Sequence, residues 1–180
     1  MKKYLLILVL FLAVNVGLIG QELSDKAAVQ KADFIFDLIS NTEWPDESAA
    51  GNDTFVISVI DQPTFVEKLK ETAAENSKLK INIEIQSISI KDDFSGSNLV
   101  YMGNGELSDL AKVLKKTEKR PILTVTDIEG YARYGVIVEL VTGNDGKGKV
   151  EYVINKMVMR KSGLKISDEL IKKAKKTFGQ

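Results

Sequence analysis

The stretch TFVISVI, residues Thr54–Ile60, decides the fold. Its β-branched and aromatic side chains favour a short strand that is buried for most of its length. A helix is expected to follow from Pro63, since proline is tolerated in a first helical turn. One side of this helix carries the apolar residues Phe65, Val66, Leu69 and Ala73. A buried strand that leads into an amphipathic helix favours a parallel crossover and therefore an α/β sheet.

The chain downstream repeats this order. Leu79–Ile90 alternates apolar and polar residues with period two, which predicts a strand with a bulge or turn near Gln86 and Ser87. Further strands are expected at Asn98–Met102 and Pro121–Thr126. The helix expected between them carries Leu107, Leu110, Ala111 and Leu114.

The two ends of this region complete the predicted layers. A helix with one buried stripe is expected at Leu23–Ser40, before the first strand. Val136–Val141 and Lys149–Ile154 predict a hairpin whose turn is built on Gly143, Asn144, Asp145 and Gly146. Two helices, at about Lys156–Ser162 and about Asp168–Phe178, close the chain. Helices between early strands and a late hairpin predict a single-domain α/β layered sandwich, a mixed sheet with helices on both faces, over residues 21–180.

The N-terminus has the three parts of a secretory signal. Lys2 and Lys3 precede an uninterrupted apolar run, Tyr4–Val14, and small residues follow at Gly17 and Gly20. A membrane anchor is the alternative, but the run is shorter than the roughly 20 apolar residues of a spanning helix. No cysteine follows the run, which excludes a lipid-modified N-terminus. We therefore expect cleavage near Gly20, with Gly17 as the alternative site, and a mature protein that works outside the cytoplasm and does not insert directly into the membrane.

The composition narrows the function classes. The chain has 25 basic and 25 acidic side chains, and loss of Lys2 and Lys3 leaves 23 against 25, a net charge of −2. Such a balance argues against nucleic acid as a partner. Cysteine and histidine are both absent, which removes thiol chemistry, Cys/His zinc sites and the usual general base of hydrolases. No catalytic, metal-binding or cofactor-binding residue can be named, and we expect a protein that is not an enzyme.

Two polar motifs have simpler structural explanations than ligand binding. Gly103-Asn104-Gly105 lies between a strand and a helix, where phosphate-binding loops occur, but it lacks the remaining residues of the known motifs. A turn that needs positive φ explains it as well. Asp92, Asp93 and Asp127 fit no calcium-loop spacing and are expected to be solvated.

Two aromatic motifs are candidates for contact with a partner protein. Trp44 and Pro45 follow the first helix, where they fit both a packing anchor and a partner contact. Tyr131, Arg133 and Tyr134 follow the Asp127 turn, and an arginine flanked by tyrosines is a composition that protein interfaces favour. The alternative is a packed tyrosine pair with a solvated arginine.

An ordered set of these motifs resembles the YfiR family of periplasmic proteins. The set begins with a helix and Thr42-Glu43-Trp44-Pro45, continues with the strand from Thr54 and ends with two segments after it. Those segments are Pro121–Gly135, with LTVTD and GYARYG, and Tyr152–Ala174, with YVIN, SGLKIS, Leu170 and Ala174. The chain departs from the family at Ser97, where cysteine is common. It also departs at Tyr134-Gly135, where the second glycine of a pair is missing, and at Lys172-Lys173, which replaces an expected leucine.

The resemblance implies an exported α/β protein without catalysis. It implies binding to the periplasmic domain of an inner-membrane sensor, a diguanylate cyclase or a histidine kinase, and repression that limits cyclic di-GMP and biofilm formation. Disulfide-based control is not carried over, since the cysteines are absent. A periplasmic module that binds a small molecule is the alternative, and a homodimer stays open.

Overall fold

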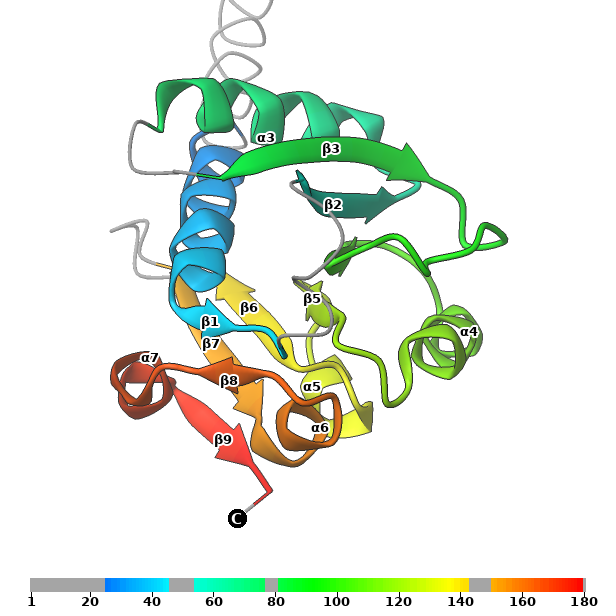
Figure 1. Cartoon of the computed structure of the whole chain (residues 1–180), viewed down its shortest axis with the longest axis vertical. Coiled ribbons are helices and arrows are strands. Elements are labelled where there is room, and N and C mark those ends of the chain that lie inside the picture. Colours follow the sequence, from blue (N-terminus) through cyan, green and yellow to red (C-terminus); the bar gives the residue numbers. More distant parts are fainter. Residues whose placement is uncertain (1–24, 46–53, 77–80, 143–149, 180) are drawn as a thin grey trace, which may run out of the picture.

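The centre of the molecule is a seven-stranded mixed sheet (Figure 1). A computed structural model of the chain describes residues 25–45, 54–76, 81–142 and 150–179. The strands lie in the order β3-β2-β4-β5-β6-β7-β9. Their bounds are β2 Thr54–Ile60, β3 Asn82–Ile88, β4 Leu99–Met102, β5 Leu123–Thr126, β6 Val138–Thr142, β7 Val150–Asn155 and β9 Lys176–Phe178.

The first five strands of this sheet along the chain, β2 to β6, are parallel. β2 pairs in parallel with β3 on one side and with β4 on the other, and β5 and β6 continue the parallel order. β7 turns back antiparallel to β6, as the predicted hairpin requires, and β9 pairs in parallel with β7. The expected turn at residues 143–146 lies outside the described residues.

Helices cover both faces of the sheet, which confirms the predicted α/β sandwich. The helix at residues 25–40 and α3 (Pro63–Glu75) cover one face, and α4 (Leu107–Thr117) and α5 (Tyr131–Tyr134) cover the other. β4 shows why both faces are apolar: Leu99 and Tyr101 join one buried cluster, while Val100 and Met102 join the other.

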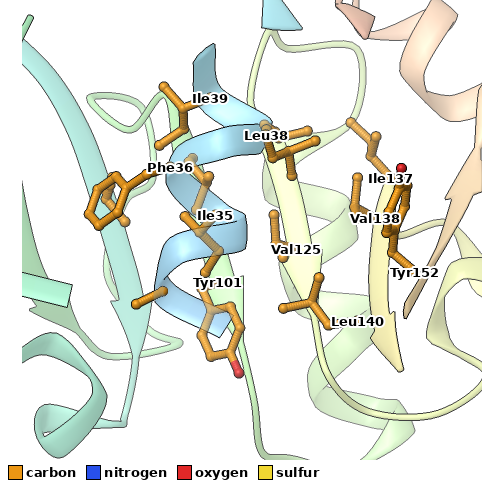
Figure 2. Packing of buried hydrophobic residues seen from close by; sticks show 14 of the residues in the cluster. Ile35, Phe36, Leu38, Ile39, Tyr101, Val125, Ile137, Val138, Leu140 and Tyr152 are labelled. Carbon is orange, nitrogen blue, oxygen red and sulfur yellow. The ribbon is translucent and has the colours of Figure 1, made fainter. Parts of the chain in front are cut away.

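The helix at residues 25–40 supplies the centre of the larger core. Figure 2 shows its side chains Ile35, Phe36, Leu38 and Ile39 near residues of the strands, among them Tyr101, Val125 and Leu140. Each of the four helical side chains is at most 4% exposed. Burial of one such side chain contributes about 2 kcal/mol, so this stripe fixes the helix on the sheet.

The C-terminal segment also packs on this helix. α6 (Lys156–Lys161), β8 (Lys165–Ile166) and α7 (Asp168–Lys173) follow β7. β8 pairs antiparallel with β1 (Thr42–Glu43), the two residues after the helix. This small sheet joins segments that are far apart in the sequence, so we did not expect it from local patterns.

Two sequence predictions of secondary structure need correction, and one element was not predicted. β3 has no bulge, because its parallel register with β2 is continuous from Asn82 to Ile88. The last helix ends at Lys173, not near Phe178, and residues Lys176–Phe178 form β9. The Lys175 amide donates to the Tyr152 carbonyl at 2.8 Å, and this pairing replaces further helical turns. α5 is a helical turn that the sequence patterns did not indicate.

The helices that the structure describes are all too short or too polar to span a membrane.

Candidate partner-binding site

A single helical turn, α5, forms the corner between β5 and β6. Gly130 before it has φ 87° and Gly135 after it has φ 127°. These left-handed conformations favour glycine, which lacks the Cβ that other residues would place in a strained position. The sequence GYARYG thus folds as one helical turn between two glycines.

Two buried polar side chains hold the backbone of this corner. The carboxylate of Glu139 on β6 is 4% exposed and accepts the amides of Gly130 at 2.9 Å and Ala132 at 2.8 Å. The first amides of a helix lack partners within the helix, so a carboxylate there supplies missing acceptors. Asn155 at the end of β7 donates to the Ala132 carbonyl at 2.8 Å. Both backbone groups of Ala132 are therefore fixed by side chains from the sheet.

Asn155 also connects the corner to α6. Its side-chain oxygen accepts the amide of Val158 at 3.0 Å, which makes Asn155 the N-cap of that helix. The residue is only 3% exposed. One buried amide group thus positions two helical turns against the same strand.

The corner buries one of its two tyrosines and exposes the other. Tyr131 is 8% exposed, and its hydroxyl donates to the Gly105 carbonyl at 3.1 Å. Arg133 is exposed, and Tyr134 is 57% exposed, which is the largest exposure among the large apolar side chains of the described residues. The α5 turn therefore exposes Arg133 and Tyr134 to solvent, while Tyr131 packs against the buried residues.

The other predicted pair lies on the opposite face of the sheet. Trp44 is half-buried against the cluster on the α3 face, with its ring edge-on to Phe55 at a centroid distance of 4.9 Å. Pro45 is half-buried beside Gly163, where an added Cβ would lie 3.0 Å from the proline ring. Tyr131 belongs to the cluster on the α4 face. The five candidates thus do not form one patch, and a partner contact at Trp44 and Pro45 stays a prediction.

An ion pair between Lys31 and Asp127 joins the helix at residues 25–40 to the start of the corner. The two side chains are 22% and 15% exposed. Tyr101 is 1% exposed, and its burial together with the neighbouring Asp127 carboxylate raises the pKa of the phenol above its ordinary value. We expected Asp127 to be solvated, so this contact corrects the prediction. The residues in the pair are 96 positions apart, and local sequence patterns carry no signal for it.

A cavity of about 490 Å³ lies between the helix at residues 25–40 and the C-terminal segment. Phe34 and Tyr152 form an aromatic wall, with ring centroids 4.5 Å apart. Other lining residues are charged: Asp33, Asp37, Glu151, Lys173 and Lys175. The Lys175 ammonium pairs with the Glu151 carboxylate at 2.6 Å, and the Lys173 ammonium pairs with Glu169 at 2.6 Å. This volume lies in the usual range of small-molecule sites.

The loop Gly103–Gly105 leads into α4, whose first amides are occupied by its own side chains. Gly105 has φ 120°, as the predicted turn requires. Glu106 and Asp109 form a reciprocal capping box at the start of the helix. The described residues contain no group of three side chains that could hold a metal ion.

Comparisons with known proteins place this geometry in context. A family model described as YfiR/HmsC-like matches residues 28–175, which is most of the chain. No curated protein matches the sequence. Two solved structures are similar in fold: the ABC domain in complex with L-Trp from Streptococcus pneumonia, with TM-score 0.55 and 15% identity, and a conserved domain protein from Vibrio cholerae, with TM-score 0.57 and 16% identity.

Both similarities concern the fold alone. The alignments cover 84% and 83% of this chain but 60% of each solved chain. The chain thus spans less than two thirds of the length of either structure.

Proposed function

The chain belongs to the YfiR/HmsC-like family, and from this premise we propose that it is a periplasmic regulator of a membrane signalling protein. It binds the extracytoplasmic domain of an inner-membrane diguanylate cyclase or histidine kinase and represses its activity. With a cyclase as partner, repression limits cyclic di-GMP and biofilm formation. The N-terminal signal at residues 1–20 supports delivery to the periplasm.

This proposal rests on the exposed pair Arg133 and Tyr134, which lies on a helical turn whose backbone is held by hydrogen bonds from buried side chains. Tyrosine and arginine dominate the binding energy of many interfaces. Binding is weakened when exposed groups must first be ordered, and a backbone that is already fixed avoids that cost. Glu139 and Asn155 fix the α5 backbone through three hydrogen bonds of 2.8–2.9 Å. The backbone that carries the pair is therefore already ordered before a partner binds.

Repression then follows from differential affinity. A sensor domain exchanges between an active and an inactive arrangement, and a protein that binds the inactive one more tightly shifts the population toward it. A coupling of about 1–3 kcal/mol changes the ratio of the two states by about 5–150-fold. The regulator needs no catalytic group for this effect.

The test measures binding of the mature protein to the purified periplasmic domain of a membrane cyclase or histidine kinase of the same organism, beginning with any that a neighbouring reading frame encodes. Tyr134→Ala and Arg133→Ala are each expected to weaken binding by at least tenfold, which corresponds to about 1.4 kcal/mol. Val29→Ala is the control, because Val29 is also exposed, at 37%, but lies on the helix that covers the opposite face of the sheet from α5. Absence of binding by the wild-type protein at micromolar concentration would refute the proposal.

A second candidate function is supported by the 490 Å³ cavity at Phe34 and Tyr152. Its aromatic wall and mixed charges suit a small zwitterionic molecule with an apolar part. A ligand that binds the folded state raises the melting temperature. A screen of small metabolites that gives a shift in the wild type, and none in Phe34→Ala, supports this function; no shift with any compound contradicts it.

A further inference from the structure

The outer edge of β3 is a long strand edge without the usual protection. β3 is the first strand of the sheet order, and no described residue pairs with its outer side. Natural edge strands are protected by proline, lysine, a bulge or short length. Asn82–Ile88 has seven residues, contains neither proline nor lysine, carries one charge at Glu84 and pairs with β2 without a bulge. Such an edge is a template for strand addition.

The backbone contacts show which residues face the open side. The Asp61 amide donates to the Ile88 carbonyl at 3.0 Å, so the backbone groups of Ile88 point toward β2. Backbone groups of successive residues in a strand point alternately to the two sides. Ile81, Ile83 and Ile85 therefore direct their amides and carbonyls outward.

The same three isoleucines share one face of the sheet. Ile83 and Ile85 pack against the buried cluster on the α3 face, and Ile81 at the start of the row is 49% exposed. Asn82 and Glu84 lie on the other face, and both are exposed. The edge thus offers an apolar row on one face and a polar row on the other.

We propose that a second copy of the chain adds antiparallel to this edge, about a twofold axis at Ile83. Ile83 then faces its own counterpart, and Ile81 of each copy faces Ile85 of the other. On the opposite face, Asn82 of each copy faces Glu84 of the other, where the amide can donate to the carboxylate. Cross-strand apolar pairs and polar pairs of this kind stabilise antiparallel sheets.

Two neighbouring registers within Asn82–Ile88 are less favourable. A twofold axis at Glu84 places two carboxylates opposite each other, and like charges in that position are destabilising. An axis at Ile85 places Ile83 opposite Ser87, so an apolar side chain meets a hydroxyl. Only the axis at Ile83 pairs all three isoleucines and keeps the carboxylates apart.

The pairing joins two seven-stranded sheets into one and leaves α5 free, because that turn lies between β5 and β6. The dimer would therefore carry two copies of the Arg133–Tyr134 corner. The inference is independent of the proposed function. The sensor test measures how substitution of Tyr134 changes binding to the sensor domain, whereas the dimer test measures how substitutions in β3 change the dimer.

The first experiment uses engineered cysteines, since the chain has none of its own. Directly opposite residues of a hydrogen-bonded antiparallel pair have Cα atoms about 5.5 Å apart, within disulfide reach. Mild oxidation of Ile83→Cys is expected to give a covalent dimer on a non-reducing gel. Glu84→Cys is the matched control, because its counterpart is displaced by two residues along the strand, beyond the reach of about 7 Å. Equal cross-linking of both variants would overturn the register.

The second experiment measures the dimer dissociation constant of the full mature protein by light scattering and sedimentation. In Asn82→Glu, the new carboxylate of each copy faces Glu84 of the other copy, so the dimer contains two such repulsive pairs. We expect this variant to raise the dissociation constant at least tenfold and Asn82→Lys to lower it. Adding Glu84→Lys to Asn82→Glu restores the wild-type value. Ser108→Glu on α4 makes the same charge change at an exposed position away from the edge and has no effect.

Two outcomes contradict the proposal. If the wild-type protein stays monomeric at a concentration on the order of 100 micromolar, a second copy does not occupy the β3 edge. The second outcome has two parts: the protein forms no dimer when the sensor domain is absent, and Asn82→Glu abolishes binding of the sensor domain. In that case a strand of the sensor, and not a second copy, occupies the β3 edge.

Discussion

Glu139→Gln should destabilise the protein far more than an ordinary loss of one charge. The carboxylate accepts two backbone amides at 2.9 and 2.8 Å in a site that is 4% exposed. The Gly130 and Ala132 amides donate to different oxygens of the Glu139 carboxylate, and the glutamine amide has an oxygen at only one of these two positions. Its NH₂ group then faces the remaining amide, and one buried donor is left without an acceptor.

The expected loss of unfolding free energy is about 3 kcal/mol. A hydrogen bond to a charged group contributes about 1.5–3 kcal/mol, and an unsatisfied buried donor costs about 1–3 kcal/mol. Urea unfolding followed by the fluorescence of Trp44, the only tryptophan, measures this loss. Glu129→Gln makes the same chemical change at an exposed position and should alter the free energy by less than about 0.5 kcal/mol.

The reasoning would be refuted by a Glu139→Gln variant whose stability lies within about 0.5 kcal/mol of the wild type. An equal loss in Glu129→Gln would also refute it, because the effect would then come from net charge and not from the two amides. The variant that retains its fold should also bind the sensor domain more weakly, since the α5 backbone is no longer fixed.

Three further predictions concern the residues around the corner. Asp127→Asn breaks the partly exposed ion pair with Lys31 and should lower the free energy of unfolding by about 1–2 kcal/mol. A double-mutant cycle with Lys31→Met should give a coupling energy above about 0.5 kcal/mol, whereas additive losses would contradict the contact. The raised pKa of Tyr101 means that the unfolded chain releases this proton from about pH 10 upward while the folded protein keeps it, so stability should fall with rising pH by about 1.4 kcal/mol per unit. Urea titrations at several alkaline pH values should show this slope in the wild type and a smaller one in Tyr101→Phe. Gly130→Ala places a side chain at φ 87° and should cost about 1–2 kcal/mol in thermal unfolding, whereas an unchanged melting temperature would show that the turn adopts another conformation.

The regular layers of the fold could be predicted because their signals are local. TFVISVI at residues 54–60 reads as a buried strand, and the structure places it inside the parallel sheet. The hairpin of β6 and β7 was likewise predictable from two apolar runs around a glycine-rich turn. Lys176–Phe178 was not, because lysines and apolar residues there continue the helical period of α7. Its strand pairing depends on β7, more than 20 residues earlier.

The candidate site could be predicted only in part. The composition of GYARYG indicated an interface, but not that Tyr131 points inward and Tyr134 outward. That division is set by the bond from the Tyr131 hydroxyl to Gly105 and by the glycines that bound the turn. Glu139 gave one overlooked signal: a single carboxylate inside the apolar run of β6 has to be paired if it is buried. The partners, Gly130 and Ala132, follow only from the fold.

The most direct test of the central claim is the dissociation constant between the mature protein and the periplasmic domain of the proposed membrane sensor, measured by calorimetry for the wild type and Tyr134→Ala. We predict micromolar or tighter binding by the wild type and at least a tenfold loss in Tyr134→Ala, with both proteins equally stable. Equal binding by the two proteins would contradict the assignment of the α5 corner as the contact. No binding by either would contradict the regulatory function.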